Sequence, residues 1–161
     1  MIELTKFHGL IFISLFCINS CAQTNTSKTV NFSTLFQVQG EFEEIRDELV
    51  EVIEDKGMVI SFVSHAGKML ERTQSTSKIK GNVYEDAEIL LFCKADLSHK
   101  LAASDVHTLV LCPQAISVYR LKSDPEIVYM SIRNAPENVV AYQAIFSLMT
   151  EIIEQVIEEN E

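Results

Sequence analysis

Residues 88–119 read EILLFCKADLSHKLAASDVHTLVLCPQAISVY, and this stretch decides the fold. Two apolar runs within it, residues 88–94 and 107–112, are rich in aliphatic and β-branched side chains, which is typical of strands. Between them, Asp96 suits a helix N-cap and predicts a short helix over residues 97–103. The stretch therefore predicts a strand–helix–strand unit in which each strand carries a cysteine near its end.

Outside this stretch, apolar periodicity predicts the remaining elements. Upstream, we expect strands at residues 34–39 and 58–64 and helices at residues 41–56 and 66–73. Downstream, we expect strands at residues 115–121 and 127–133 and then a helix from Pro136 with an apolar stripe about 20 residues long. This order predicts an α+β fold: a single mixed β-sheet of about five to six strands, with helices packed mainly on one face and a long C-terminal helix. The stripe needs cover from the sheet or from a second subunit, so a homodimer is one expectation.

The composition describes one acidic domain. The chain has 161 residues, of which 47% are hydrophobic, and this suits a single domain, which we place at residues 34–161. The formal net charge of −10 repels nucleic acid and anionic lipid headgroups, so neither is an expected partner. Five glycines are too few for a glycine-rich phosphate-binding loop.

The N-terminus carries the features of an export signal. Residues 10–18 form an apolar run, which is too short for a membrane-spanning helix of about 20 residues. The following Ile18-Asn19-Ser20-Cys21 resembles the lipobox of bacterial lipoproteins. That resemblance implies removal of a signal peptide, residues 1–20, and transfer of a diacylglyceryl group to the Cys21 thiol. The alternative is an ordinary secretory signal with an incidental cysteine.

The same resemblance implies a location for the protein. Residues 21–33 are polar and rich in Ser, Thr and Asn, so they suit a tether between membrane and domain. Two or more acyl chains hold a protein stably on a bilayer, since each buried methylene contributes about 0.8 kcal/mol. We therefore expect a protein of the bacterial cell envelope that is anchored through the lipid on Cys21 and faces the periplasm or the exterior.

Two cysteines keep their thiols once Cys17 is removed with the signal and Cys21 is acylated. These are Cys93 and Cys112. An exported protein meets an oxidising compartment, so the pair is a disulfide candidate that would close a loop of about 20 residues and contribute roughly 3 kcal/mol. The alternatives are two buried free thiols, a redox pair or a metal-binding pair. The spacing is not CxxC, so it gives little support to thioredoxin-like chemistry.

Two histidines and an arginine are the other candidate site residues. His65 lies at a strand-to-helix junction, Arg72 on the helix that follows, and His99 on the helix between the cysteines. We expect the histidines to meet at the rim of one ligand pocket that Arg72 also lines. With a cysteine they could bind a soft metal or haem iron, but neither HxxxH nor CxxCH spacing is present, so no metal site or cofactor is predicted. No GxSxG motif is present either, and no catalytic residue is predicted.

Several short segments resemble a known family. They are Ser64-His65-Ala66-Gly67, Phe92-Cys93, Leu111-Cys112-Pro113 and Ile116-Ser117-Val118-Tyr119. In these segments the chain resembles the domain of unknown function 302 family, and residues 69–73 (MLERT) with the two cysteines are similar to a cysteine-bearing bacterial branch of it. The resemblance covers residues 34–133. It implies a small α+β domain, often dimeric, without an established activity.

These observations favour a binding protein over an enzyme. The first hypothesis is a lipid-anchored envelope domain that binds a small ligand or a partner and has no catalysis of its own. The second is a thiol or sulfur redox protein that uses Cys93 and Cys112, and the third is a metal or haem binder.

Overall fold

Strands with alternating apolar side chains build one sheet. The computed structural model describes residues 27–77 and 81–160, so the signal peptide and Cys21 lie outside the described residues. Within these ranges the strands are β1 (Lys28–Val30), β2 (Ser33–Gln39), β3 (Val59–Ser64), β4 (Tyr84–Cys93), β5 (Gln114–Leu121) and β6 (Asp124–Arg133). They lie in the order β1-β2-β6-β5-β4-β3, and every neighbouring pair is antiparallel.

The predicted fold class is confirmed, with one correction to the strand directions. The described chain is an α+β domain with one open sheet of six strands and a long C-terminal helix. The sheet was expected to be mixed, but all of its strand pairs are antiparallel. No two neighbouring strands run in the same direction. The sheet also begins at Lys28, inside the range expected to serve as a tether, because Lys28 pairs with Leu35 of β2.

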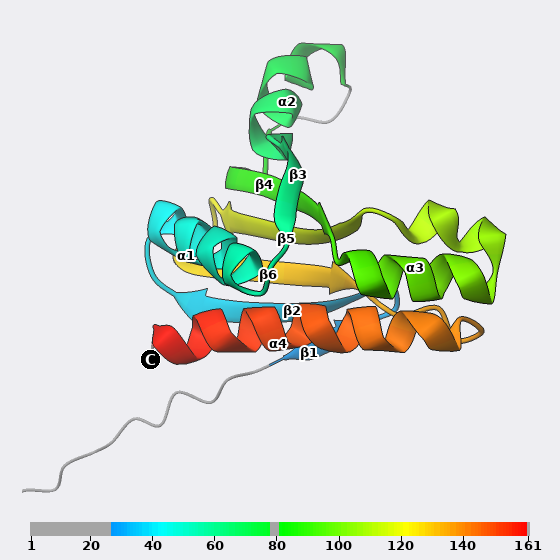
Figure 1. Cartoon of the computed structure of the whole chain (residues 1–161). Helices are drawn as coiled ribbons and strands as arrows, with labels where there is room; N and C mark the ends of the chain where they lie inside the picture. The colour runs from blue at the N-terminus through cyan, green and yellow to red at the C-terminus, as the bar shows by residue number, and fades with distance from the viewer. Residues whose placement is uncertain (1–26, 78–80, 161) are drawn as a thin grey trace, which may run out of the picture.

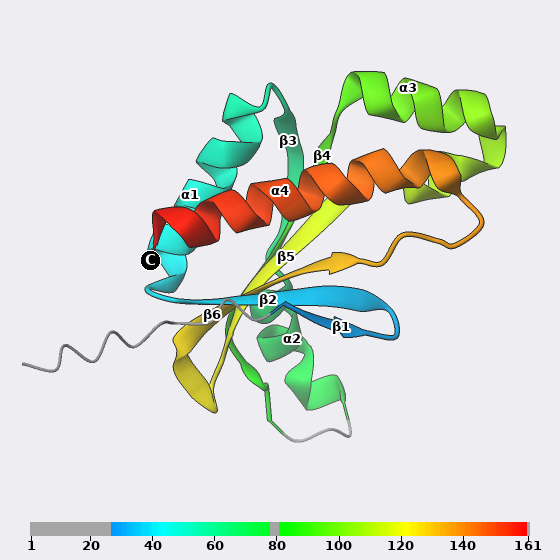
Figure 2. The ribbon, with the colours of Figure 1, turned by 90° about the horizontal axis from the view of Figure 1, so that it is seen from below.

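Helices cover mainly one face of this sheet. The α-helices are α1 (Phe42–Asp55), α2 (Ala66–Thr73), α3 (Ala95–Ser104) and α4 (Gln143–Glu159), and the 3₁₀ helices are η1 (Gln74–Thr76), η2 (Val106–Leu111) and η3 (Val140–Tyr142). Figure 2 shows α1 and α4 on one side of the sheet and α2 on the other. α3 and the η2 segment project past the end of β4 (Figure 1). α3 starts one residue before its predicted N-cap, which places Asp96 in the first turn instead.

The core lies between the sheet and the pair α1 and α4. Alternate residues of the central strands are buried there: Leu90, Phe92, Ile116, Val118, Val128, Met130 and Ile132. The helices bury Ile45, Leu49, Ile53, Met149, Ile152, Ile153 and Val156 against them. The segment Val140–Glu159 is long and apolar enough to cross a membrane, but its stripe is part of this core. The sheet and α1 therefore cover the stripe, and the homodimer stays a prediction.

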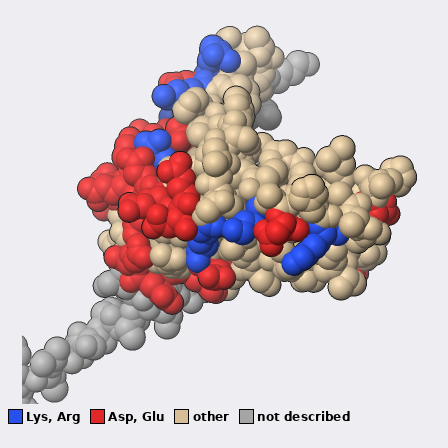
Figure 3. Space-filling model, in the orientation of Figure 1, with Lys and Arg blue, Asp and Glu red and all other residues tan. Residues whose placement is uncertain are grey.

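Charge is concentrated at one end of the molecule. α1 turns one face into the core and carries its glutamates and aspartates on the opposite face. Figure 3 shows these acidic side chains gathered over α1, while the end formed by α3 and η2 carries fewer charged side chains in the same view. The projection of α3 and η2 is therefore the less charged end of an acidic protein.

Residues 107–112 do not form the predicted strand. The chain makes the 3₁₀ helix η2 there, because two side chains bond locally to the backbone. The Asp105 carboxylate accepts a hydrogen bond from the backbone N–H of His107 at 2.8 Å. The hydroxyl of the buried Thr108 donates to the carbonyls of Asp105, at 2.7 Å, and Leu101, at 3.0 Å. These bonds hold η2 against α3 and leave most of its aliphatic side chains exposed.

Candidate functional site

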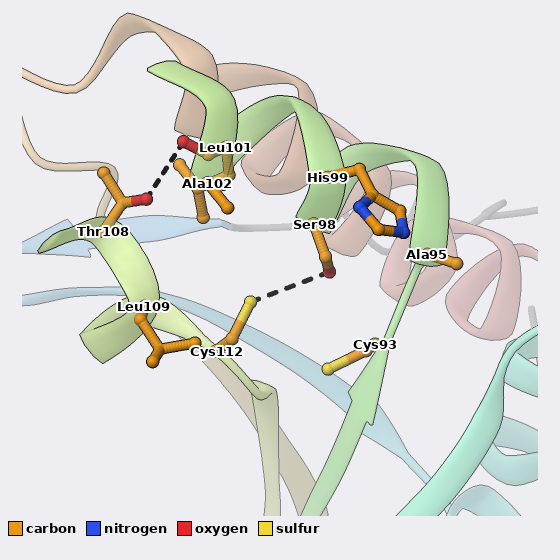
Figure 4. A pocket seen from close by; sticks show the side chains of 9 residues that line it. All are labelled: Cys93, Ala95, Ser98, His99, Leu101, Ala102, Thr108, Leu109 and Cys112. Atoms are coloured by element: carbon orange, nitrogen blue, oxygen red, sulfur yellow. Dashed lines mark hydrogen bonds between the residues drawn. The ribbon is translucent and has the colours of Figure 1, made fainter. Parts of the chain in front are cut away.

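The end of the β4–β5 ladder brings the two cysteines together. Its last pair joins Phe92 of β4 to Gln114 of β5. One further step along an antiparallel ladder sets Cys93 opposite Pro113, directly beside Cys112. The peptide bond between Cys112 and Pro113 is cis. Figure 4 shows that both sulfur atoms point into the same pocket.

The helices α3 and η2 form the walls of this thiol pocket beside the cysteines. Its volume is about 290 Å³, and its wall is mainly apolar, with Leu101, Ala102 and Leu109 among the lining residues. Ser98 and His99 of α3 supply the polar groups beside the sulfur atoms (Figure 4). A concave apolar wall with a few convergent polar groups is the usual form of a small-ligand site.

Hydrogen bonds connect the two sulfur atoms to their surroundings. The side chain of Gln114, which is only 3% exposed, donates from Nε2 to the Cys112 sulfur at 3.4 Å. The Cys112 thiol in turn donates to Ser98 Oγ at 3.6 Å. Hydrogen-bonding interactions with the backbone of Gln114 and the side chain of Ser98 lower the pKa of the Cys93 thiol. Gln114 and Ser98 therefore influence both sulfurs.

The thiol of Cys93 is harder to ionise than a free cysteine. Burial raises the pKa of Cys93, and the neighbouring Cys112 raises it further; the bonds from Gln114 and Ser98 offset this rise only in part. Because the thiolate is the nucleophilic form of cysteine, the raised pKa lowers the fraction of Cys93 that is ready to attack an electrophile.

Both cysteines are free thiols in the structure. Cys93 is exposed and Cys112 is half-buried. The alternative of two buried thiols therefore does not describe Cys93. The two sulfurs are neighbours in the pocket (Figure 4), and the disulfide between Cys93 and Cys112 stays a prediction.

The structure does not bring the two histidines together. His99 lines the thiol pocket. His65 precedes α2, and its Nδ1 lies 2.7 Å from Oε1 of Glu88. The residue before His65 pairs with Ile89, whereas the thiol pocket begins at Cys93, so the two histidines lie at opposite ends of the β3–β4 pair.

A second groove, of about 360 Å³, lies on the other face of the sheet beside α2. Its wall includes Leu35, Leu70, Tyr84 and Tyr119. Arg72 is exposed on α2 and lines neither this groove nor the thiol pocket. Of the three predicted pocket residues, only His99 lies in the thiol pocket.

Sequence reasoning overlooked Gln114, although a signal for it was present. Gln114 shares the alternation of Ile116 and Val118, which face the core along β5. A glutamine on the buried face of a strand must find hydrogen-bond partners inside the protein. Ser98 carried no comparable signal, because a serine on a short helix is ordinary.

A family model places the chain among known proteins. The model for the domain of unknown function DUF302 matches residues 35–159, from β2 to the end of α4. The chain belongs to the DUF302 family. The match confirms the resemblance carried by the segments around His65 and the two cysteines.

A solved DUF302 structure shares the fold. It is the crystal structure of an uncharacterized conserved DUF302 protein from Bacillus stearothermophilus, with a TM-score of 0.59 and 10% sequence identity. The match covers 82% of this chain and 100% of that one, and at this identity it shows the fold alone. No curated protein matches this DUF302 chain. Its function therefore rests on the chemistry of its own site.

Proposed function

We propose that this DUF302 chain is a lipid-anchored domain of the bacterial cell envelope that binds a ligand in the thiol pocket without catalysing a reaction. One observation carries the binding role: Cys93, Ser98, His99 and Cys112 gather in one mainly apolar pocket of about 290 Å³. This volume is close to the lower end of the range for small-molecule sites, roughly 300–1,000 Å³. The raised pKa of Cys93 supports a role without nucleophilic attack.

The anchor is supported by the lipobox-like segment that ends at Cys21. A bacterial host that expresses the full chain should attach lipid to Cys21, so the protein should enter the detergent phase of a Triton X-114 extraction. Cys21→Ala should remain in the aqueous phase, and Cys17→Ala should behave as the wild type does. Aqueous partition of the wild-type protein would contradict the anchor and leave an ordinary export signal.

The binding role is tested with N-phenyl-1-naphthylamine, an uncharged apolar dye that fluoresces in apolar sites. Ala102 lines the pocket, so Ala102→Phe should fill it and abolish the fluorescence gain. The neighbouring Ala103 is exposed and does not line the pocket, which makes Ala103→Phe the matched control. Equal dye binding by both variants, or none by the wild type, would contradict ligand binding in this pocket.

A second candidate function is reversible thiol redox chemistry, favoured by two neighbouring free thiols of which one is exposed. In such a step Cys93 and Cys112 lose two hydrogens to form a disulfide, and a partner disulfide takes up two electrons and two protons to become two thiols. Equilibration with glutathione buffers and mass spectrometry measures the potential. A bridge that stays intact below about −300 mV would be structural and would exclude this function.

A further inference from the structure

We infer that Cys93 and Cys112 form a two-coordinate site for a soft monovalent cation with a filled d shell, of which Cu(I) is the biological example. The site lies at the sulfur end of the thiol pocket, so it rests on the proposed function that this pocket binds a ligand. Thiolates are soft ligands and select Cu(I) over harder ions. The two sulfurs are neighbours and point into one space (Figure 4).

The ligand count separates Cu(I) from zinc. A structural zinc site takes about four protein ligands and a catalytic one about three. Within residues 27–77 and 81–160, no group of three or more His, Cys, Asp or Glu side chains is placed to hold a metal. A two-sulfur site lacks the ligands that zinc needs, whereas Cu(I) accepts two thiolates in a line.

Binding exchanges two protons for one cation. Cu(I) displaces the protons of both thiols, two Cu–S bonds form, and two protons leave to solvent. The bound unit of one positive ion and two thiolates keeps one negative charge. An uncompensated charge in an apolar pocket is costly, so the site needs hydrogen-bond donors at the sulfurs.

Gln114 supplies a hydrogen-bond donor to the sulfurs, although burial of its amide is itself unfavourable. Its Nε2 donates to the Cys112 sulfur, and its backbone is near enough to Cys93 to lower the pKa of that thiol. Its Oε1 is buried without a hydrogen-bond partner. A neutral thiol is a weak acceptor, so burying an amide to reach it brings little stability. A hydrogen bond to an anionic sulfur is roughly twice as strong, and hydrogen bonds to metal-bound sulfur tune such sites.

The pocket combines an apolar wall with one cysteine that solvent can reach. Leu101 and Leu109 belong to the apolar wall of the pocket, and the apolar shell around a metal site controls solvent access to it. Cys93 is exposed, so an ion carried by a soluble chelator reaches the first sulfur from solvent. Cys112, which is half-buried, then completes the pair.

The test is a Cu(I) titration against the chromophoric chelator bicinchoninate, without oxygen. The full chain carries Cys17→Ser and Cys21→Ser throughout, so that Cys93 and Cys112 are the only thiols. We expect one Cu(I) per chain. Cys93→Ser and Cys112→Ser should each weaken binding by more than the roughly 10–100-fold that loss of an outer-shell partner costs. His107→Ala, which changes an exposed histidine that does not line the pocket, should bind as the parent does.

Gln114→Leu, which removes the amide without adding a sulfur ligand, tests the hydrogen-bond donor. It should weaken Cu(I) binding roughly 10-fold or more, as loss of an outer-shell partner does. Far-UV circular dichroism checks that each variant is folded, and Cys93→Ser is at an exposed position where folding is not at stake. Zn(II) binding as tight as Cu(I) binding would overturn the inference, and so would Cu(I) binding that survives Cys93→Ser.

Failure of this inference is distinguishable from failure of the proposed function. If the parent chain takes up no Cu(I) but still binds the naphthylamine dye in an Ala102→Phe-sensitive manner, the cation site is wrong and the ligand pocket stands. If neither probe binds, both are wrong.

Discussion

The side-chain amide of Gln114 donates a hydrogen bond to the sulfur of Cys112 across 3.4 Å, from inside the protein. The same side chain leaves its carbonyl oxygen buried without a partner. An unpaired buried acceptor costs about 1–3 kcal/mol, which is more than a bond to a neutral thiol returns. Gln114 is therefore better explained by the needs of the thiol pocket than by the stability of β5.

Gln114→Met should not destabilise the metal-free protein. The change removes an unpaired buried acceptor and a weak bond to sulfur and keeps most of the side-chain volume, so the free energy of unfolding should rise by about 0–2 kcal/mol. Urea unfolding at neutral pH with a chelator present measures this. A loss greater than about 2 kcal/mol would show that the amide serves the fold itself.

Thr108→Val should loosen the cover of the thiol pocket. The buried Thr108 hydroxyl donates to two carbonyls, of Leu101 and Asp105, and holds η2 to α3. Its loss leaves buried carbonyls without that donor, so unfolding should become easier by about 1–2 kcal/mol. Thr150→Val is the matched control, because Thr150 Oγ1 is buried on α4 without a hydrogen-bond partner. Equal losses in the two variants would mean that the Thr108 bonds contribute nothing.

Gly67→Ala should destabilise the packing of α2 on the sheet. A Cβ at Gly67 would lie 2.9 Å from the backbone nitrogen of Ala87 on β4, so the helix would have to move. Overpacking of this kind costs about 1–3 kcal/mol, against a helix-propensity gain of about 1 kcal/mol. Lys68 is the next residue in α2 and is exposed, so the free energy of unfolding of Lys68→Ala should stay within about 0.5 kcal/mol of the wild type. Thermal unfolding compares them, and a Gly67→Ala variant as stable as Lys68→Ala would refute the close approach.

Tyr129→Phe should reveal a pH-dependent contribution to stability. The Tyr129 hydroxyl donates to Asp124 Oδ2 at 2.6 Å, and this bond raises the pKa of Tyr129 from 10.0 to about 12. The protonated phenol is the donor, so its contribution is complete below pH 10 and is lost as the pH rises through about 12. Urea unfolding near pH 8 should show a loss of about 1–3 kcal/mol in the variant, since the acceptor is charged. The difference should shrink above pH 10, and a constant difference would contradict the bond.

Much of the fold follows from periodicity in the sequence. The amphipathic helices α1 and α4 and the strands β2 to β6 occur in the regions where apolar spacing predicts them, because they contribute to a common core. Two boundaries differ: α4 begins at Gln143 rather than Pro136, and β4 begins at Tyr84 rather than residue 88. Direction does not follow from spacing, since an apolar run reads alike in a parallel and an antiparallel sheet. β1 was not predicted, because it lies in a polar segment and has no buried face. Backbone pairing with β2 holds it in the sheet.

The site was predicted in part. Cys93, Cys112 and His99 lie in one pocket. In place of the strand predicted at residues 107–112, the chain forms η2 (Val106–Leu111), which the Asp105 and Thr108 side chains stabilise. Apolar content alone cannot distinguish that helix from a strand. His65 and His99 were expected to meet at one pocket rim but lie at opposite ends of the β3–β4 pair. The sequence alone does not show which loops meet at the same end of a sheet.

The most direct test of the thiol pocket is the reaction of the folded chain with phenylarsine oxide, which bonds two neighbouring thiols at once and releases water. In the Cys17→Ser and Cys21→Ser background, mass spectrometry of the native protein should show one phenylarsenic group bridging Cys93 and Cys112. Either single serine variant of the pair should lose this stable adduct. Two thiols that each take up N-ethylmaleimide while the native chain forms no arsenic bridge would show that the sulfurs are not held together, and would contradict the site.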